Sequence, residues 1–364
     1  MRILYFYSWQ HFTTGSPKML ATTVELVDRT RHQPVFLATG EGPLVTELAE
    51  RGAEIVRRPV SEVAAGRPLR ASGNVMGAAR WLKRQRIDLL HVNEFGWNQD
   101  IVLGAWLARV PVVLHVHTKL RIHPRNLNRL AAWRVLFVSE AHRRETAGLE
   151  LIDGKARVLH NAIDVERYAR GRNIRAELGL APSDTVITTV CQISERKAVD
   201  VFLDVAAALL RRTPSLTFLI VGPVGRGEQA YADRQTARAA DPAFGGRVRF
   251  LGPRQDIPDI LKSSDIFFLP SRHETYGLVV AEAMAASLPV VASNAGGIPE
   301  IVSSATIGSL AQVDDREGFV TALDLLVDSP ERRRIIGCAA RKSLDGRFDR
   351  ATYARALDAL YAEA

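Results

Sequence analysis

Residues 266–284 read IFFLPSRHETYGLVVAEAM, and this stretch decides the fold. A short apolar run, 266–269, leads into a polar loop, and a helical pattern begins near Gly277. Apolar runs without polar alternation are typical of parallel strands that are buried on both faces. The stretch therefore predicts a strand, loop and helix of a parallel α/β sheet.

The same rhythm extends along most of the chain. We expect helices at 19–30, 44–51 and 73–85, and a final amphipathic helix at 350–363. The segment 161–184 is polar and is interpreted as an interdomain connection that contains one helix. The predicted fold is two doubly wound α/β domains in tandem, with ligands at the carboxyl ends of the strands. The expected strands are 3–7, 34–38, 54–56, 87–92, 111–117 and 135–138, then 186–190, 217–221, 247–251, 266–269 and 289–292.

Length and composition agree with a folded protein of two domains. The chain has 364 residues, of which 47% are hydrophobic and 24% charged. The apolar run at 3–7 is too short for a signal peptide, and no run reaches the roughly 18 residues of a membrane span. We therefore expect a cytoplasmic protein, or one peripheral to the inner face of the membrane. Two widely separated cysteines predict neither a disulfide framework nor a metal cluster.

The net charge of +8 is compatible with phosphates, nucleic acid or an anionic membrane as partners. It is equally compatible with a solvated, arginine-rich surface. The segment 119–144 is rich in basic residues, which is compatible with a lipid-linked acceptor at an anionic membrane.

The loop before the predicted helix carries the first chemical signal. We expect Thr275 or a neighbour to cap the helix, whose free N–H groups can hold a phosphate, and Gly277 allows close approach of a ligand. On one helix, Glu274 and Glu282 would lie about 12 Å apart, whereas a hydrolytic carboxylate pair needs roughly 5 to 9.5 Å. They are better interpreted as acceptors for hydroxyl groups at two ends of a ligand. Taken alone, the segment is equally compatible with a capped surface helix.

Other ligand signals follow predicted strands. Arg196 and Lys197 lie where a phosphate would sit, and Gly296-Gly297 is a candidate backbone cradle. His115 and His117 should point to the same side of their strand, but no further ligand has suitable spacing, so we expect no metal. The chain lacks GxGxxG after the first strand and the GKS/GKT, HExxH, paired CxxC and GxSxG motifs.

Taken together and in this order, these segments resemble glycosyltransferase family 4, the retaining enzymes of GT-B fold. The resemblance covers nearly the whole chain and is densest at 190–302. It implies two facing Rossmann-like domains: 1–165 on the acceptor side, 166–345 for the nucleotide-sugar donor, and a helix at 346–364 that returns to the first domain. It also implies transfer of a hexose-type sugar from a nucleotide-diphosphate sugar, within glycan biosynthesis.

Residue roles are implied by the same resemblance. His117, Lys197 and Glu274 would be catalytic: His117 lies against the donor sugar, Lys197 neutralises the diphosphate, and Glu274 holds sugar hydroxyls. Glu282 would hold the ribose, and Asn161 and Asp164 would form the hinge. The implied donor-binding residues are Gly15, Ser16, Gln192, Arg196, Lys197, Leu251, Gly252, Glu274, Thr275, Tyr276, Gly277, Leu278, Val279 and Glu282.

The chain departs from the family pattern at several places. Cys191-Gln192 stands where Gly-Arg is common, and Ala198 and Ser287 stand where glycine is common. Gln192 cannot supply a charge, so Arg196 is expected to share that role with Lys197. The other departures affect loop geometry more than the class of reaction.

The resemblance further implies no cofactor and no required metal, with the leaving phosphate accepting the acceptor's proton. The expected partners are the donor and a glycan, lipid-linked or small-molecule acceptor, with peripheral membrane contact left open and no nucleic acid. Two alternatives stay open: a nucleotide-sugar enzyme of the UDP-sugar 2-epimerase type, and an inactive sugar-nucleotide-binding partner.

Overall fold

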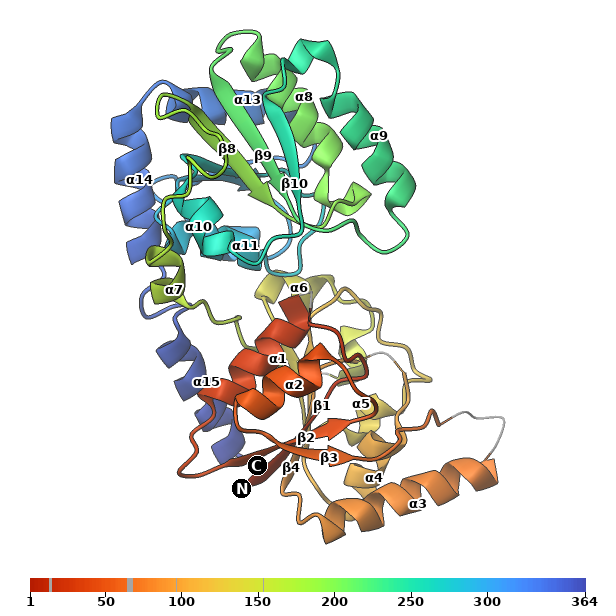
Figure 1. Ribbon diagram of the computed structural model, residues 1–364. Helices are drawn as coiled ribbons and strands as arrows, with labels where there is room; N and C mark the ends of the chain where they lie inside the picture. Colours follow the sequence, from red (N-terminus) through yellow and green to blue (C-terminus); the bar gives the residue numbers. More distant parts are fainter. Residues whose placement is uncertain (13–14, 64–67, 96, 153) are drawn as a thin grey trace. The chain divides into compact units, whose positions relative to one another are not determined.

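The structure is a computed structural model that describes residues 1–364 apart from 13–14, 64–67, 96 and 153 (Figure 1). The chain divides into two compact units. Unit 1 contains Met1–Ala162 and Arg350–Ala364, and unit 2 contains Ile163–Asp349. The boundaries expected from the sequence lie after residues 165 and 345.

Unit 1 is built on a parallel sheet of seven strands, in the order β3-β2-β1-β4-β5-β6-β7. The order reverses between β1 and β4, which pair in register from Ile3 with Leu89 to Phe6 with Val92. Such a switch point is where ligands bind in doubly wound sheets. The strands are β1 (Arg2–Phe6), β2 (Gln33–Ala38), β3 (Glu54–Arg57), β4 (Leu89–Val92), β5 (Val112–Val116), β6 (Arg134–Phe137) and β7 (Ala156–Val158).

The chain's last helix, α15 (Arg350–Ala362), belongs to unit 1, so the predicted return of this helix to the first domain is confirmed. It lies in the same unit as the N-terminal strand, and both ends of the chain lie there (Figure 1). Tyr353 of α15 shares a hydrogen bond of 2.7 Å with the hydroxyl of Thr23 on α1. The other helices of unit 1 are α1 (Gly15–Leu26), α2 (Pro43–Glu50), α3 (Pro68–Arg84), α4 (Asp100–Ala108), α5 (Asn128–Ala131), α6 (Glu140–Glu145) and the 3₁₀ turn η1 (Leu149–Ile152).

Unit 2 repeats the architecture with six parallel strands in the order β10-β9-β8-β11-β12-β13. Its strands are β8 (Thr185–Val190), β9 (Leu216–Val221), β10 (Val248–Gly252), β11 (Ile266–Leu269), β12 (Val290–Ser293) and β13 (Ser309–Ala311). Its helices are α7 (Val165–Ala169), η2 (Glu195–Lys197), α8 (Val199–Leu210), α9 (Gln229–Ala239), η3 (Pro242–Phe244), α10 (Ile257–Lys262), α11 (Leu278–Ala285), α12 (Ile298–Ile301), α13 (Arg316–Val327) and α14 (Pro330–Lys342).

The predicted strands form where apolar side chains can be buried on both faces of a sheet. All four residues of β11 are fully buried, and Phe268 stacks on Phe202 of α8 with ring centroids 5.3 Å apart. The sequence pattern missed β7 and β13, which are three-residue strands at the sheet edges with partly exposed side chains. In the connection at 161–184 the expected helix is α7, which Asp164 caps by accepting from the amide of Arg167. Among the described residues, no helix combines the length and apolar character needed to cross a bilayer.

Candidate functional site

A buried ion pair lies at the carboxyl edge of the unit 2 sheet. Lys197, at the end of η2, pairs closely with the carboxylate of Glu274, in the loop after β11. Only 10% of the Lys197 side chain and 7% of the Glu274 side chain are exposed. Ser271 donates its hydroxyl to the same carboxylate over 3.0 Å, and Arg196 lies 3.9 Å from its other oxygen. The adjacent strands β8 and β11 thus bring together residues 77 positions apart in the sequence.

The charge on Glu274 is stabilised in this setting. Burial by itself would raise the pKa of its carboxyl group, but the charge of Lys197 and its hydrogen bond outweigh burial. The pKa therefore lies below its ordinary value, and Glu274 is ionised at neutral pH. An ionised, buried carboxylate accepts hydrogen bonds but cannot donate a proton, so this site suits recognition of hydroxyls rather than acid catalysis.

Helix α11 begins directly after this loop, and glycine rather than threonine caps it. The N-cap is Gly277, two residues beyond Thr275, in the left-handed region with φ 93°, and as a glycine it has no side chain to accept from the helix. The first turn carries Leu278 and Val279, whose main-chain N–H groups lie at the positive end of the helix dipole. A Cβ on Gly277 would lie 2.9 Å from Ile298, so only glycine fits without a shift.

Two of the expected donor-binding side chains are occupied by contacts within unit 2. Tyr276 is 2% exposed and packs edge-on against Phe348, with ring centroids 6.1 Å apart. Glu282 of α11 is half-buried and hydrogen bonds with the buried hydroxyl of Tyr168 on α7. Burial and this carboxylate raise the pKa of Tyr168. The Tyr276 side chain therefore serves packing, whereas Glu282 keeps a partly accessible carboxylate.

The Gly296-Gly297 turn after β12 supports Glu274 from behind. The amide of Gly297 donates to the main-chain carbonyl of Glu274 over 3.3 Å, and Gly296 has φ 50°. A Cβ on Gly296 would lie 1.6 Å from that carbonyl oxygen. The turn therefore holds the Glu274 main chain, whereas the sequence had indicated a cradle for a ligand.

The sequence did not single out Arg272, which ties η2 to the Glu274 loop. Its guanidinium donates to Asp200 over 3.0 and 2.6 Å, to Asp314 over 2.9 Å and to the carbonyl of Glu195 over 2.9 Å. Its amide donates to the carbonyl of Arg196 over 2.9 Å. These contacts fix the backbone that carries Arg196 and Lys197.

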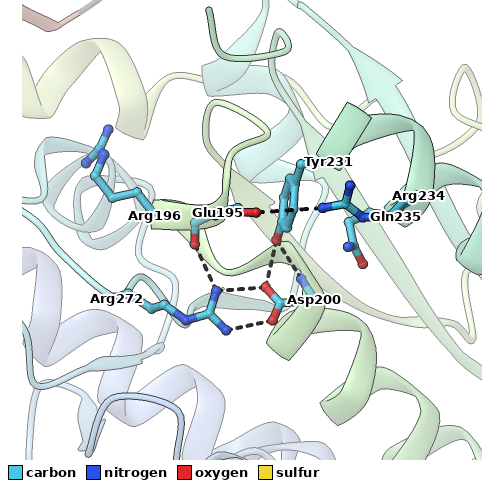
Figure 2. A pocket seen from close by; sticks show the side chains of 7 residues that line it. All are labelled: Glu195, Arg196, Asp200, Tyr231, Arg234, Gln235 and Arg272. Atoms are coloured by element: carbon cyan, nitrogen blue, oxygen red, sulfur yellow. Dashed lines mark hydrogen bonds and ion pairs between the residues drawn. The ribbon is translucent and has the colours of Figure 1, made fainter. Parts of the chain in front are cut away.

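The same network lines a pocket of about 540 Å³ (Figure 2). Tyr231 of α9 donates to Asp200 over 2.7 Å, while Arg196 points away from this pair in the figure. The guanidinium of Arg196 instead donates to the carbonyl of His273 over 3.1 Å. The lining residues are Glu195, Arg196, Asp200, Tyr231, Arg234, Gln235 and Arg272.

The remaining expected residues of unit 2 lie at or just beyond the carboxyl ends of β8 and β10, which flank β9 in the sheet. Gln192 lies two residues beyond β8 and is half-buried. Leu251 and Gly252 end β10, where Leu251 packs on the apolar core and Gly252 adopts φ 67°. The carbonyl of Gly252 accepts from the amide of Gly222 over 2.9 Å.

In unit 1, the expected residues Gly15, Ser16 and His117 lie beyond β1 and β5. Gly15 and Ser16 form the first turn of α1, which begins before the expected helix at 19–30 because Pro17 is tolerated in the first turn of a helix. His117 donates from Nε2 to Asn93 Oδ1 over 2.8 Å, and Asn93 donates to the carbonyl and hydroxyl of Ser16 over 3.1 and 2.9 Å. Asn93, which the sequence analysis missed, thus links the other two.

Three histidines of unit 1 are held neutral. Burial, and then the neighbouring His117, lowers the pKa of His91 to about 3. Burial and the neighbouring histidines also hold the pKa values of His115 and His117 well below the ordinary range. As the strand alternation predicts, His115 and His117 lie on one side, with ring centroids 4.2 Å apart. Within the described ranges, no three His, Cys, Asp or Glu side chains form a group able to hold a metal ion.

Comparison with known proteins gives the same two-part division. The family model described as Glycosyltransferase Family 4 matches residues 14–167, and the one described as Glycosyl transferases group 1 matches residues 171–343. Solved structures similar over the whole chain include Anabaena Alr3699/HepE in complex with UDP, with a TM-score of 0.82, 22% identity and 100% of both chains covered. A glycosyltransferase from Rickettsia africae has a TM-score of 0.82 at 18% identity, covering 100% of this chain and 98% of that one.

Curated relatives match a shorter stretch. The D-inositol 3-phosphate glycosyltransferase of Rhodococcus opacus is 39% identical over 184 residues, which cover 49% of this chain and 41% of the relative. That of Saccharomonospora viridis is 33% identical over 212 residues, 56% of this chain and 48% of the relative. The matched stretch thus spans less than half the length of these relatives.

Two Rossmann-like units with a returning C-terminal helix define the GT-B fold of nucleotide-sugar glycosyltransferases. Since the two family models together span almost the whole chain, the protein belongs to the family 4 glycosyltransferases, as its sequence motifs had indicated.

Proposed function

We propose that this protein is a retaining glycosyltransferase that moves a hexose from a nucleotide-diphosphate sugar to an acceptor hydroxyl. The observation that carries the proposal is the buried Lys197–Glu274 pair in the loop that leads to the glycine-capped start of α11. Breaking a sugar–phosphate bond develops negative charge on the diphosphate. A cation and a helix N-terminus at one edge of a sheet oppose that charge without a metal.

Unit 2 supplies the donor contacts in this proposal. Glu274 accepts hydrogen bonds from sugar hydroxyls, since it is ionised and buried. Lys197, Arg196 and the main-chain N–H groups of Leu278 and Val279 face the diphosphate, and Glu282 holds the ribose. Gly252 at the end of β10 lies beside the base. The UDP and UDP-glucose complexes of Anabaena Alr3699/HepE support UDP-sugars as the first donors to test.

The family resemblance assigns His117, Ser16 and Gly15 of unit 1 to the donor as well. His117 is neutral, so it offers a hydrogen bond to a sugar hydroxyl and no positive charge. Retention is proposed because the resemblance to family 4 implies it, with the leaving phosphate taking the acceptor proton. The acceptor is a glycan, a lipid-linked or a small-molecule hydroxyl; the similarity to the D-inositol 3-phosphate glycosyltransferase of Rhodococcus opacus favours a small phosphorylated polyol.

The test incubates the purified chain with UDP-, GDP- and ADP-hexoses, with and without D-inositol 3-phosphate. The expected result is release of the nucleoside diphosphate. The new linkage should have the same anomeric configuration as the donor sugar, measured by NMR. Glu274→Gln should lower turnover by at least a hundredfold, because a neutral amide accepts hydrogen bonds from the sugar hydroxyls more weakly in the transition state. Glu317→Gln, an exposed carboxylate on α13, is the control. Absence of binding and turnover with every nucleotide sugar would refute the proposal.

Peripheral membrane contact is a separate proposal that a simple assay can decide. The basic segment 119–144 supports it only as a charge pattern. Sedimentation with vesicles containing 30% anionic lipid, compared with neutral vesicles, is the measurement. We expect salt-sensitive binding to the anionic vesicles, and no sedimentation would remove this contact from the proposed function.

A further inference from the structure

A buried chain of polar side chains runs through unit 1 from the last helix toward His117. The hydroxyl of Tyr361 on α15 lies 2.7 Å from His91 Nδ1, and His91 Nε2 lies 3.3 Å from His115 Nδ1. The Tyr361, His91 and His115 side chains are fully buried. The ring of His115 lies against the ring of His117, tilted by 37°. The chain joins α15, β4 and β5, which supply its members in turn.

The far end of this chain fixes the tautomer of His117. The carbonyl of Ser16 can only accept, so the Asn93 group that faces it must be the amide NH₂. The carbonyl of Asn93 therefore faces His117 Nε2, which must carry the proton. Because His117 is neutral, its Nδ1 carries the lone pair. The side of the imidazole that accepts a hydrogen bond is thus set by Asn93 and Ser16.

The near end of the chain has two internal proton arrangements. Tyr5, whose hydroxyl lies 3.2 Å from that of Tyr361, either donates to Tyr361 or accepts from it. If Tyr5 donates, each proton points along the chain, and His115 carries its own on Nε2. If Tyr5 accepts, His115 holds its proton on Nδ1. His115 Nε2 is buried and has no hydrogen-bond partner among the described residues.

In both arrangements the Tyr361 hydroxyl links the hydrogen bond of Tyr5 to that of His91. With it, both arrangements are available, because the hydroxyl either donates to His91 Nδ1 or accepts from it. Without it, a proton on His91 Nδ1 would have no acceptor on α15, so the balance of tautomers would shift toward His91 with its proton on Nε2 and His115 accepting at Nδ1. An imidazole that changes tautomer also changes the dipole against which His117 is stacked. A residue on the returning helix can thereby influence a ring that it does not contact.

We propose that Tyr361 is a positioning residue for His117, acting through the tautomers of His91 and His115. In this role α15 contributes to the reaction as well as to the packing of unit 1. Its effect on turnover rests on the proposed transferase function, whereas its effect on the histidine rings does not.

The test compares two phenylalanine variants of the full chain. Tyr361→Phe removes the hydroxyl that contacts His91, while Tyr353→Phe removes another buried hydroxyl of α15, bonded to Thr23 and not to a histidine. Both variants keep the ring. Tyr361→Phe loses the contacts with His91 and Tyr5 and Tyr353→Phe the one with Thr23, so both should be modestly destabilised, Tyr361→Phe more so. Histidine ring ¹⁵N spectra report the tautomers, assigned from single His→Gln variants of the nine histidines.

In Tyr361→Phe the ring ¹⁵N shifts of His91, His115 and His117 should move, and kcat with the best donor should fall roughly three- to tenfold with little change in KM. In Tyr353→Phe the three rings and kcat should match the unaltered protein. If Tyr361→Phe unfolds, His91→Asn interrupts the same chain and should shift the same two remaining rings. Unchanged His115 and His117 spectra would overturn the proposal. If the unaltered protein transfers no sugar, the proposed function fails and the spectra alone decide this inference.

Discussion

The main-chain carbonyl of Glu274 lies only 1.6 Å from the position that a Cβ on Gly296 would occupy. The two residues follow adjacent strands, β11 and β12, so the packing of one turn sets the position of the other. Glu274 is therefore held from both sides: its carboxylate by Lys197 and Ser271, and its backbone by the Gly296-Gly297 turn.

Gly296→Ala should accordingly be far more damaging than a typical Gly→Ala change. Gly296 has φ 50° and Gly245, at the end of η3, has φ 55° with open space around it. Both alanine variants incur about 1 kcal/mol for the left-handed backbone, and only Gly296→Ala adds a backbone clash, for a total of about 3 kcal/mol or more. Urea unfolding of the full chain measures both. Equal losses in the two variants would show that the close approach to Glu274 is not rigid.

The Lys197–Glu274 pair should show strong coupling in a double-mutant cycle. Lys197→Met alone leaves a buried carboxylate without its cation and should lower the free energy of unfolding by about 3 kcal/mol. Adding Glu274→Gln should recover most of that loss, since no unpaired charge remains. Additive effects in urea unfolding would mean that solvent already screens the pair.

Ser287 is a place where the protein can be made more stable. It adopts φ 64°, a conformation that favours glycine, at a position where the family pattern commonly has glycine. Ser287→Gly should raise the free energy of unfolding by up to about 1 kcal/mol. Ala198 also has a left-handed backbone, but its methyl group is fully buried, so Ala198→Gly should gain less. A loss of stability in Ser287→Gly would show that the left-handed backbone of Ser287 is not strained.

Unit 1 should lose stability in mild acid because the fully buried His91 and His115 and the partly buried His117 are neutral. Their folded pKa values lie below the unfolded value of about 6.5, so below that pH the unfolded chain binds protons that the native one does not. Stability is thus complete above about pH 6.5 and falls toward the His91 pKa of about 3. The slope should reach about 1.4 kcal/mol per pH unit for each histidine, or about 4 for the three. The groups that face them are Tyr5, Tyr361, Asn93 and His142.

The five tryptophans make this measurement specific to unit 1, because Trp9, Trp81, Trp97, Trp106 and Trp133 all lie there. Urea unfolding followed by tryptophan fluorescence should be compared at pH 7.5, 6.5 and 5.5. His91→Gln should flatten the dependence by about one histidine's share, and the exposed His123→Gln serves as the control. A stability of unit 1 that does not change over this range would contradict neutral burial of the histidines.

The sequence by itself determined the sheet architecture and the residues gathered at its edge. An apolar run such as 266–269 has to be buried on both faces, and parallel strands bring their following loops to one edge, so Lys197 and Glu274 could be expected together. Short edge strands such as β13 were not predicted, since three partly exposed residues carry no periodic pattern.

Only the tertiary structure decided which polar atoms meet. Tyr361 and His91 are 270 positions apart, and Arg272 finds Asp200 and Asp314 only once three separate segments are folded. Likewise, the use of Gly296 as a support for Glu274, and of Tyr276 as packing, depends on which surface each turn faces. Hydrogen bonds and close contacts require distances of a few ångströms, and local sequence patterns do not encode the three-dimensional distances between remote segments.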